Sequence, residues 1–287
     1  MAKYGMLLDL SRCIGCHTCE IACKMCYGTR PGVDYGKVKY VEWGEYPEAR
    51  QAYQLNMCMH CENAPCISVC PVGATYKTEE GPVVVDYDKC IGCGLCVQNC
   101  PYGARYLVED DETSFEGQVM VYEEESAQRL KVVEKCTMCY ARAQAGLNPM
   151  CTDHCPGRCR IFGDVEDAGS DISKAIAERN ATQVEGTSIW YVAPADMPAE
   201  LLPVGLAEAC AAAGITLPDA PAPTPEPTAD PTASAAPVAP SGEEKGGVSG
   251  GVVAGIVAGA AVIAGGVAAY ANKSKKKDEN KEVGKDA

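Results

Sequence analysis

Short apolar runs, rather than long helical stretches, characterise the first part of the chain. Two of them, Tyr4–Asp9 and Val83–Asp86, have the length of a strand, and each leads into a group of cysteines. A third apolar run of strand length is Ser188–Val192. These segments predict short strands, and the first two should pair beside the cysteine groups.

Outside the cysteine groups, helical character is limited to two segments, and both follow the last group. Ser170–Arg179 begins with a residue that suits an N-cap, so it predicts a helix capped by Ser170. Ala199–Ala213 predicts a second helix. Before them, the insertion Tyr106–Val133 carries two acidic stretches and predicts a turn or hairpin. Short strands together with few helices indicate the α+β class.

The composition changes towards the C-terminus. Pro218–Pro240 contains eight prolines among Ala, Thr, Asp and Glu, which predicts an extended, semi-rigid linker. Val248–Ala271 contains no charged residue and is long enough for a membrane-spanning helix. The expected division is a core at 1–165, an extension packing on it at 166–215, a Pro/Ala-rich linker at 216–247, a transmembrane helix at 248–271 and a Lys-rich tail at 272–287.

The charges beside the uncharged segment predict its orientation. Lys273 and Lys275–Lys277 follow directly, so the positive-inside rule keeps the tail in the cytoplasm and places the cysteine-rich core on the outer face of the cell membrane. Met1–Leu10 has no apolar run of signal-peptide length, so an outward core would have to cross with a signal-bearing partner. A cytoplasmic core with a reversed tail is the alternative.

Cysteine content and net charge limit which partners and which metal sites the chain can have. The chain of 287 residues has 19 cysteines and a formal net charge of −14, and an acidic surface argues against nucleic acid as a partner. Sixteen cysteines fall into four tight groups, which leave little spacing for separate disulfide bridges. Zinc suits a Cys-x2-Cys pair, but a third cysteine two residues later and a fourth three residues further suit an iron–sulfur cluster better. The groups are Cys13, Cys16, Cys19 and Cys23; Cys58, Cys61, Cys66 and Cys70; Cys90, Cys93, Cys96 and Cys100; and Cys136, Cys139, Cys151 and Cys155.

The spacing within a group also predicts how groups combine. Three cysteines in a tight loop can bind one cubane, while the fourth should start a short helix and, as in two-cluster ferredoxins, bind the neighbouring cluster. The second and third groups then form one ferredoxin-like unit, and the first and fourth groups form another. The predicted ligand sets for four [4Fe–4S] clusters are Cys13, Cys16, Cys19 and Cys155; Cys136, Cys139, Cys151 and Cys23; Cys58, Cys61, Cys66 and Cys100; and Cys90, Cys93, Cys96 and Cys70.

Other chemistry is sparse in the sequence. Cys26, Cys159 and Cys210 fit no group, and packing or a free thiol is expected for each because every predicted cluster already has four ligands. The three histidines, His17, His60 and His154, lie inside the groups, where tuning or a surface position is favoured over ligation. No catalytic arrangement of Ser, His and Asp, paired-carboxylate site or phosphate loop stands out. The sequence therefore predicts an electron carrier without a catalytic centre of its own.

The residues around the cysteines resemble a known family. CIGCHTCEIACK at 13–24, CMHCENAPCISVCPVGATYK at 58–77, DKCIGCGLCVQNCPYGAR at 88–105, KCTMC at 135–139 and CPGRCRIFGD at 155–164 resemble the iron–sulfur subunit of dimethyl-sulfoxide-reductase-type molybdopterin oxidoreductases. The resemblance implies a catalytic partner subunit that carries a molybdopterin cofactor with molybdenum or tungsten. It also implies that such a partner, often exported through a twin-arginine signal, carries this chain across the membrane already folded.

Several functions remain open on the sequence alone. The leading hypothesis is an electron-transfer subunit that relays single electrons between a molybdopterin catalytic subunit and a membrane or external redox partner, such as a quinone-reactive membrane subunit. Alternatives are the iron–sulfur subunit of a membrane hydrogenase or formate dehydrogenase, and a free-standing, membrane-tethered polyferredoxin. A structural zinc or disulfide protein is the alternative of a different class. The identity of a co-purifying large subunit would separate the first three.

Overall fold

A computed structural model describes residues 2–110, 113–115, 118–121, 123–124 and 129–216. The predicted linker beyond Thr216, the predicted transmembrane helix at 248–271 and the Lys-rich tail lie outside these residues. Within the described ranges, no helix is both long enough and apolar enough to cross a membrane.

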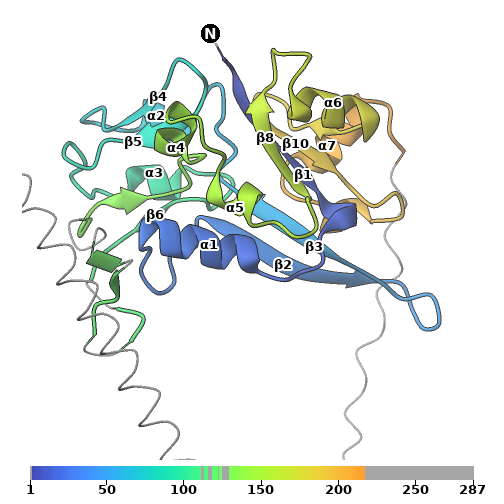
Figure 1. Cartoon of the computed structure of the whole chain (residues 1–287), viewed down its shortest axis with the longest axis horizontal. Helices are drawn as coiled ribbons and strands as arrows, with labels where there is room; N and C mark the ends of the chain where they lie inside the picture. The colour runs from blue at the N-terminus through green and yellow to red at the C-terminus, as the bar shows by residue number, and fades with distance from the viewer. Residues whose placement is uncertain (1, 111–112, 116–117, 122, 125–128, 217–287) are drawn as a thin grey trace, which may run out of the picture. The chain divides into compact units, whose positions relative to one another are not determined.

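A four-stranded sheet with the order β8-β1-β10-β9 organises the described part (Figure 1). Its centre is β1 (Tyr4–Asp9), which pairs antiparallel with β8 (Arg160–Asp164) and parallel with β10 (Ile189–Val192). The short strand β9 (Thr182–Gln183) pairs antiparallel with β10 at the edge of the sheet. The prediction of strands at Tyr4–Asp9 and within 188–192 is confirmed. Because β10 follows the cysteine groups in sequence, the extension completes a sheet that begins at the N-terminus.

The alternation of side chains along β1 explains its position. Leu7 is buried with Ile172 of α6 (Asp171–Glu178) on one face of the sheet. Met6 and Leu8 belong to the main core on the other face. The predicted cap of α6 is confirmed, since the Ser170 hydroxyl accepts a hydrogen bond from the Ser173 N–H at 3.1 Å.

A long hairpin that the sequence analysis did not predict packs under the main core. It consists of β2 (Gly36–Trp43) and β3 (Arg50–Met57), paired in register along their whole length. Ala52, Leu55 and Met57 on β3 are buried in the main core. Only part of β2 is buried, and its mixture of Lys, Tyr and Val gives a weak apolar alternation. The hairpin is therefore difficult to detect from periodicity.

Two small hairpins accompany the cysteine groups. The strands β4 (Thr75–Lys77) and β5 (Val83–Val85) form one, which confirms the strand predicted at Val83. The predicted pairing of this strand with Tyr4–Asp9 is wrong, because β5 pairs with β4 and β1 pairs with β8 and β10. The strands β6 (Tyr106–Leu107) and β7 (Val133–Glu134) form the other and close the acidic insertion at its base. The predicted hairpin is thus present at the two ends of the insertion, while residues between them lie partly outside the described part.

The prediction that the fourth cysteine of each group starts a helix is wrong. Short helices precede that cysteine in three groups and contain the third one: α2 (Pro65–Ser68), α3 (Leu95–Gln98) and α5 (Met150–Asp153). The fourth cysteine in these groups stands before a proline, and a residue in that position disfavours helical backbone angles. Lys24 follows Cys23 in the first group, and there α1 (Thr18–Tyr27) continues through the fourth cysteine.

The single helix predicted at 199–213 is also wrong, because the structure has two pieces. A 3-10 turn, η3 (Ala199–Leu201), is followed by α7 (Leu206–Ala212). Pro203 cannot donate a helical hydrogen bond, and Gly205 at the start of α7 has a left-handed φ of 83°. The remaining helical elements are α4 (Tyr140–Gln144) after Cys139 and the 3-10 turn η1 (Leu10–Arg12) before Cys13.

Candidate metal centres

The structure brings the grouped cysteines together in sets of four, each drawn from two groups. Three sets line a cavity each, and the cavities contain three cysteines of one group and the fourth cysteine of its partner group. We call these site 1, site 3 and site 4. Their cysteines are Cys13, Cys16, Cys19 and Cys155 at site 1; Cys58, Cys61, Cys66 and Cys100 at site 3; and Cys70, Cys90, Cys93 and Cys96 at site 4.

The remaining four grouped cysteines, Cys23, Cys136, Cys139 and Cys151, form site 2, and none of them is exposed. Burial raises the pKa of the Cys23 thiol well above its ordinary value, and the nearby charges of Cys136, Cys151 and Cys139 raise it further. Cys23 and Cys136 pack against the same small apolar cluster, and α1, which carries Cys23, packs against α5, which carries Cys151. Site 2 therefore combines Cys23 of the first group with three cysteines of the fourth. Among the described residues, no three Cys, His, Asp or Glu side chains converge tightly enough to hold a single metal ion.

Left-handed turns inside the loops bend the chain around each site. Gly15 at site 1 and Gly92 at site 4 have φ values of 66° and 65°. A Cβ atom would lie 2.2 Å from the Tyr53 ring at Gly15 and 2.2 Å from the Lys131 carbonyl oxygen at Gly92. Glycine is therefore required at both positions by the backbone angle and by the close approach of a neighbouring segment.

Backbone N–H groups point at several of the sulfurs. The N–H of Val133 lies 3.5 Å from Cys90 Sγ, and that of Met138 lies 3.3 Å from Cys136 Sγ. Hydrogen bonds of this kind favour the thiolate, which is the form that binds metal, and they adjust the electronic properties of a bound group. The loops thus supply donors as well as ligands.

Buried donors without a partner also fit an iron–sulfur group. Among the described residues, Arg105 Nη2, Arg160 Nε and Nη2, and His60 Nε2 are buried without a hydrogen-bond acceptor. Such atoms are costly to bury in an apolar interior. A cluster with bound thiolates and sulfides is negatively charged and would supply acceptors beside them. The donor set and the four-cysteine cavities together fit clusters of this type.

The three histidines have different surroundings. His17 and His154 are exposed, with His17 Nδ1 lying 2.6 Å from Glu20 Oε2 and His154 Nδ1 lying 3.0 Å from the Met150 carbonyl oxygen. His60 is fully buried, and its Nδ1 accepts a hydrogen bond from the Val83 N–H at 2.9 Å. Burial, together with nearby cations, lowers the pKa of His60 well below its ordinary value, so the ring is neutral with its proton on Nε2. The ring can therefore donate from Nε2 but not ligate through it.

Cys159 belongs to site 1, whereas the sequence predicted only packing or a free thiol for it. It lines the site 1 cavity, and its Sγ lies 3.3 Å from Cys155 Sγ. Hydrogen bonding with Cys159 lowers the pKa of Cys13 to about 6 and that of Cys155 to about 5. The spacing of four residues between Cys155 and Cys159 was the available signal, because both cysteines flank the same tight turn. Cys210 is instead buried in the main core.

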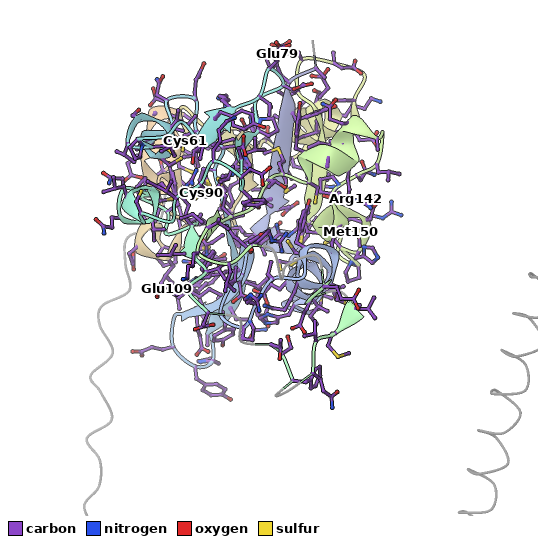
Figure 2. All side chains as sticks on the ribbon, turned by 90° about the vertical axis from the view of Figure 1, so that its left-hand side faces the viewer. Cys61, Glu79, Cys90, Glu109, Arg142 and Met150 are labelled. Carbon is purple, nitrogen blue, oxygen red and sulfur yellow. The ribbon has the colours of Figure 1, made fainter. Side chains whose placement is uncertain are left out.

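Contacts between sites define their order. Cys19 of site 1 and Cys23 of site 2 lie one turn apart on α1, and Lys135 Nζ donates to the carbonyl oxygens of Cys136 at site 2 and of Val83 in the wall of site 3. Sites 3 and 4 are joined through Arg105, which lines site 3 and donates from Nη1 to Thr75 Oγ1 in the wall of site 4 at 3.2 Å. The sites therefore follow one another in the order 1, 2, 3, 4. In Figure 2, Cys61 of site 3 and Cys90 of site 4 lie on one side of the molecule, and Met150, which precedes Cys151, lies on the other.

The two end sites open to the surface. Of the sixteen grouped cysteines, Cys16 at site 1 and Cys93 at site 4 are exposed, while the others are partly or fully buried. Ile14 beside Cys16 and Ile91 beside Cys93 are each 62% exposed. Sites 2 and 3 therefore lie inside, and each end of the series presents an apolar surface next to an accessible ligand.

Two family models match the cysteine-rich part of the chain. A model described as a 4Fe-4S dicluster domain matches residues 49–122 and 119–165, which contain the second, third and fourth groups. A model described as a 4Fe-4S binding domain matches residues 10–28, which contain the first group.

Several reductase subunits are similar to this chain. The iron–sulfur subunit of a proposed dimethyl sulfoxide reductase of Halobacterium salinarum is 41% identical over 212 residues, covering 67% of this chain and 79% of that protein. The iron–sulfur subunit of the arsenate respiratory reductase of Shewanella sp. is 31% identical over 224 residues, covering 66% of this chain and 96% of that protein. A subunit of the tetrathionate reductase of Salmonella typhimurium is 37% identical over 199 residues, covering 66% of this chain and 72% of that protein.

Proposed function

The chain belongs to the family of iron–sulfur subunits of dimethyl-sulfoxide-reductase-type oxidoreductases, and we propose that it binds four [4Fe–4S] clusters at sites 1 to 4 and relays single electrons along them. The observation that carries the proposal is the series of four four-cysteine sets, open to the surface only at its two ends in the described part. When bound, each cluster supplies reversible one-electron chemistry.

The residues of the chain perform three tasks in this function. The cysteine thiolates hold each cluster, and the exchange of the fourth cysteine ties neighbouring sites together. Backbone N–H groups such as those of Val133 and Met138 stabilise the negative charge at the sulfurs. Burial of Cys139 at site 2 and of Cys58 and Cys66 at site 3 shields the inner sites from water. The chain therefore provides an insulated path rather than a catalytic centre.

Two redox partners fit the two ends of the path. The relatives are named as subunits of reductases for dimethyl sulfoxide, arsenate and tetrathionate, which supports a separate molybdopterin catalytic subunit as one partner. The other would be a membrane or external redox partner, such as a quinone-reactive subunit. The exposed isoleucines at Ile14 and Ile91 suit docking at both ends, because apolar contact excludes water near an exposed cluster ligand.

The membrane attachment is also part of the proposal. The uncharged segment 248–271 would cross the cell membrane, with Lys275–Lys277 held on the cytoplasmic side. The iron–sulfur domain would then lie on the outer face, at the end of the Pro-rich linker. A partner with its own export signal would carry the folded domain across.

Metal analysis of the complex tests the cluster assignment. Protein purified without oxygen should contain about 16 irons and about 16 labile sulfides per chain, since each cluster contributes four of both. Optical absorption near 400 nm should accompany the iron, because zinc and disulfides do not absorb there. Eight or fewer irons in a preparation whose EPR spectra show no cluster damage would overturn the assignment of four clusters. A co-purifying hydrogenase pair in place of a molybdopterin chain would favour the hydrogenase alternative.

A further inference from the structure

Three buried cations lie between successive sites, one at each junction. Arg105, Lys135 and Arg160 are 3%, 0% and 3% exposed. None of them forms an ion pair with a carboxylate among the described residues. By contrast, Arg129, another largely buried cation, pairs with Glu134 at 2.8 Å. Burying an unpaired cation is costly, so these three positions call for a negative charge, which no carboxylate of the described residues provides.

Arg105 connects site 3 with site 4. Its side chain lines the site 3 cavity, and its Nη1 donates to Thr75 in the wall of site 4. Burial raises the pKa of both Cys66 and Cys96, and the Arg105 charge opposes that rise at each thiol. One guanidinium therefore acts on a ligand from each of the two sites, while its Nη2 has no partner in the described part.

Lys135 occupies the junction between site 2 and site 3. Its Nζ donates to the carbonyl oxygen of Val83, which lines site 3, and to that of Cys136 at site 2 at 2.6 Å. Both acceptors are neutral carbonyls. No carboxylate among the described residues pairs with this ammonium group, which lies where the two ferredoxin-like units meet.

Arg160 occupies the equivalent position between site 1 and site 2. Its Nη1 lies 3.7 Å from Met57 Sδ, and its Nε and Nη2 have no acceptor among the described residues. Desolvation raises the pKa of Cys19 at site 1 and Cys151 at site 2, and the Arg160 charge opposes it at both thiols. Arg160 follows the fourth cysteine of its group by five residues, as Arg105 does. Each ferredoxin-like unit therefore places a buried arginine at the same position relative to its cysteines.

We propose that Arg105, Lys135 and Arg160 are positioning charges that raise the reduction potentials of the two clusters flanking each of them and screen the repulsion between electrons on neighbouring clusters. The inference rests on the proposed function. Reduction adds one electron and no proton to a cluster, so the oxidised charge of about −2 becomes about −3, counting iron, sulfide and thiolate charges. In a buried site this increase is resisted by the charge of the next cluster and favoured by a cation placed between them.

Redox titration monitored by EPR tests this role in the complete complex. In Arg105→Gln the reduction equilibria of sites 3 and 4 should shift towards the oxidised form by at least about tenfold, which is about 59 mV for a one-electron couple. Lys135→Gln should shift sites 2 and 3, and Arg160→Gln should shift sites 1 and 2, by a similar factor. In each variant the two sites that do not flank the residue should keep their potentials.

Two exposed cations provide matched controls. Lys89 stands one residue before Cys90, as Lys135 does before Cys136, but its side chain is 63% exposed and pairs with Asp86. Arg158 is exposed and lies two residues from Arg160. Lys89→Gln and Arg158→Gln remove the same charge from solvent-screened positions, so they should leave all four potentials within about twofold of the unaltered protein.

The outcomes distinguish this inference from the proposed function. Unshifted potentials in a Gln variant with full iron would overturn the inference, as would equal shifts in Lys89→Gln. If Arg105→Gln or Arg160→Gln fails to load iron, the variant Arg105→Lys or Arg160→Lys, which keeps the positive charge, takes its place. Full iron with unchanged potentials of the flanking clusters would support a role for the charge. Lowered potentials would overturn the inference. Too little iron in the unaltered chain would instead contradict the four-cluster assignment itself.

Discussion

The sulfur atoms of Cys155 and Cys159 lie 3.3 Å apart at the wall of site 1. Cys155 belongs to the four-cysteine set, whereas Cys159 is a fifth thiol that is buried against both Cys13 and Cys155. Because the neighbouring thiols favour their ionised form, Cys159 keeps its proton, and its pKa lies above the ordinary value. The single thiol proton of Cys159 is therefore placed to be donated to the sulfur of either Cys155 or Cys13, beside the Cys159 N–H, which donates to Cys155 Sγ at 3.4 Å.

Removing this donor should change one cluster only. In Cys159→Ala the complex should keep about 16 irons per chain, while the potential of site 1 should fall because a hydrogen bond to its sulfur ligands is lost. EPR-monitored titration would measure the shift, and Cys210→Ala, which removes a thiol from the main core, is the matched control. Loss of about four irons in Cys159→Ala would show that Cys159 is itself a ligand.

The exchange of the fourth cysteine between groups gives a second prediction. Cys100 follows Cys96 in sequence but lines site 3 with Cys58, Cys61 and Cys66. Cys100→Ser should therefore alter the EPR signal and stability of the site 3 cluster and leave the signal of site 4 intact. The reciprocal variant, Cys70→Ser, should alter site 4 and leave site 3 intact, because Cys70 lines that cavity. A change at site 4 in Cys100→Ser would contradict the arrangement.

Two glycines near site 4 allow the cost of a left-handed backbone angle to be measured apart from the cost of steric overlap between a new Cβ atom and a neighbouring segment. Gly73 and Gly92 have similar left-handed φ values of 63° and 65°, but among the described residues only Gly92 has a neighbour, the Lys131 carbonyl oxygen, at the position a Cβ would take. Gly73→Ala should cost about 1–2 kcal/mol of stability from strain alone. Gly92→Ala should cost a further 1–3 kcal/mol or so from overpacking and should reduce iron loading at site 4.

Anaerobic denaturant unfolding of the cluster-loaded protein would measure both values. Equal losses for the two variants would show that the loop around Gly92 moves away from Lys131 without cost. A larger loss for Gly73→Ala would contradict the role of close approach altogether.

The sequence predicted the parts of the molecule that local rules determine. The cap at Ser170 and the strand Tyr4–Asp9 follow from residue type and apolar pattern, and both are observed. The helix around Cys66 was misplaced, although the proline after Cys70 contained the needed information. The hairpin Gly36–Met57 could not be predicted, because its burial depends on a core assembled from distant segments.

The burial of the charged residues near the sites could not be predicted from the sequence either, because it also depends on distant segments. Arg105 and Arg160 share their spacing from Cys100 and Cys155, so their equivalence was visible in the sequence. Their burial between two sites was not, because it depends on the pairing of groups in space. Lys135 and Lys89 both precede the first cysteine of a group, yet one is fully buried and the other exposed. Sequence context alone does not distinguish them.

The proposed membrane arrangement gives the last prediction, since it determines on which side electrons leave the path. Lysines at 275–277 resist translocation, so the proposed helix at 248–271 should place the iron–sulfur domain outside the cell membrane. Protease added to intact cells, or to protoplasts if an outer barrier is present, should cut between Pro218 and Pro240 and release the domain with its clusters. A variant with Glu in place of Lys273 and Lys275–Lys277 should reduce this release, because the orientation signal is removed while the apolar segment is kept.

The opposite arrangement has an equally clear signature. A domain that resists protease in intact cells and is released only after lysis would lie in the cytoplasm, where its clusters are assembled. Its redox partners would then have to be cytoplasmic, and no export with a signal-bearing subunit would be needed. Release into the soluble fraction without any protease would instead show that residues 248–271 do not anchor the chain, because an uncharged helix of that length should hold it in the membrane.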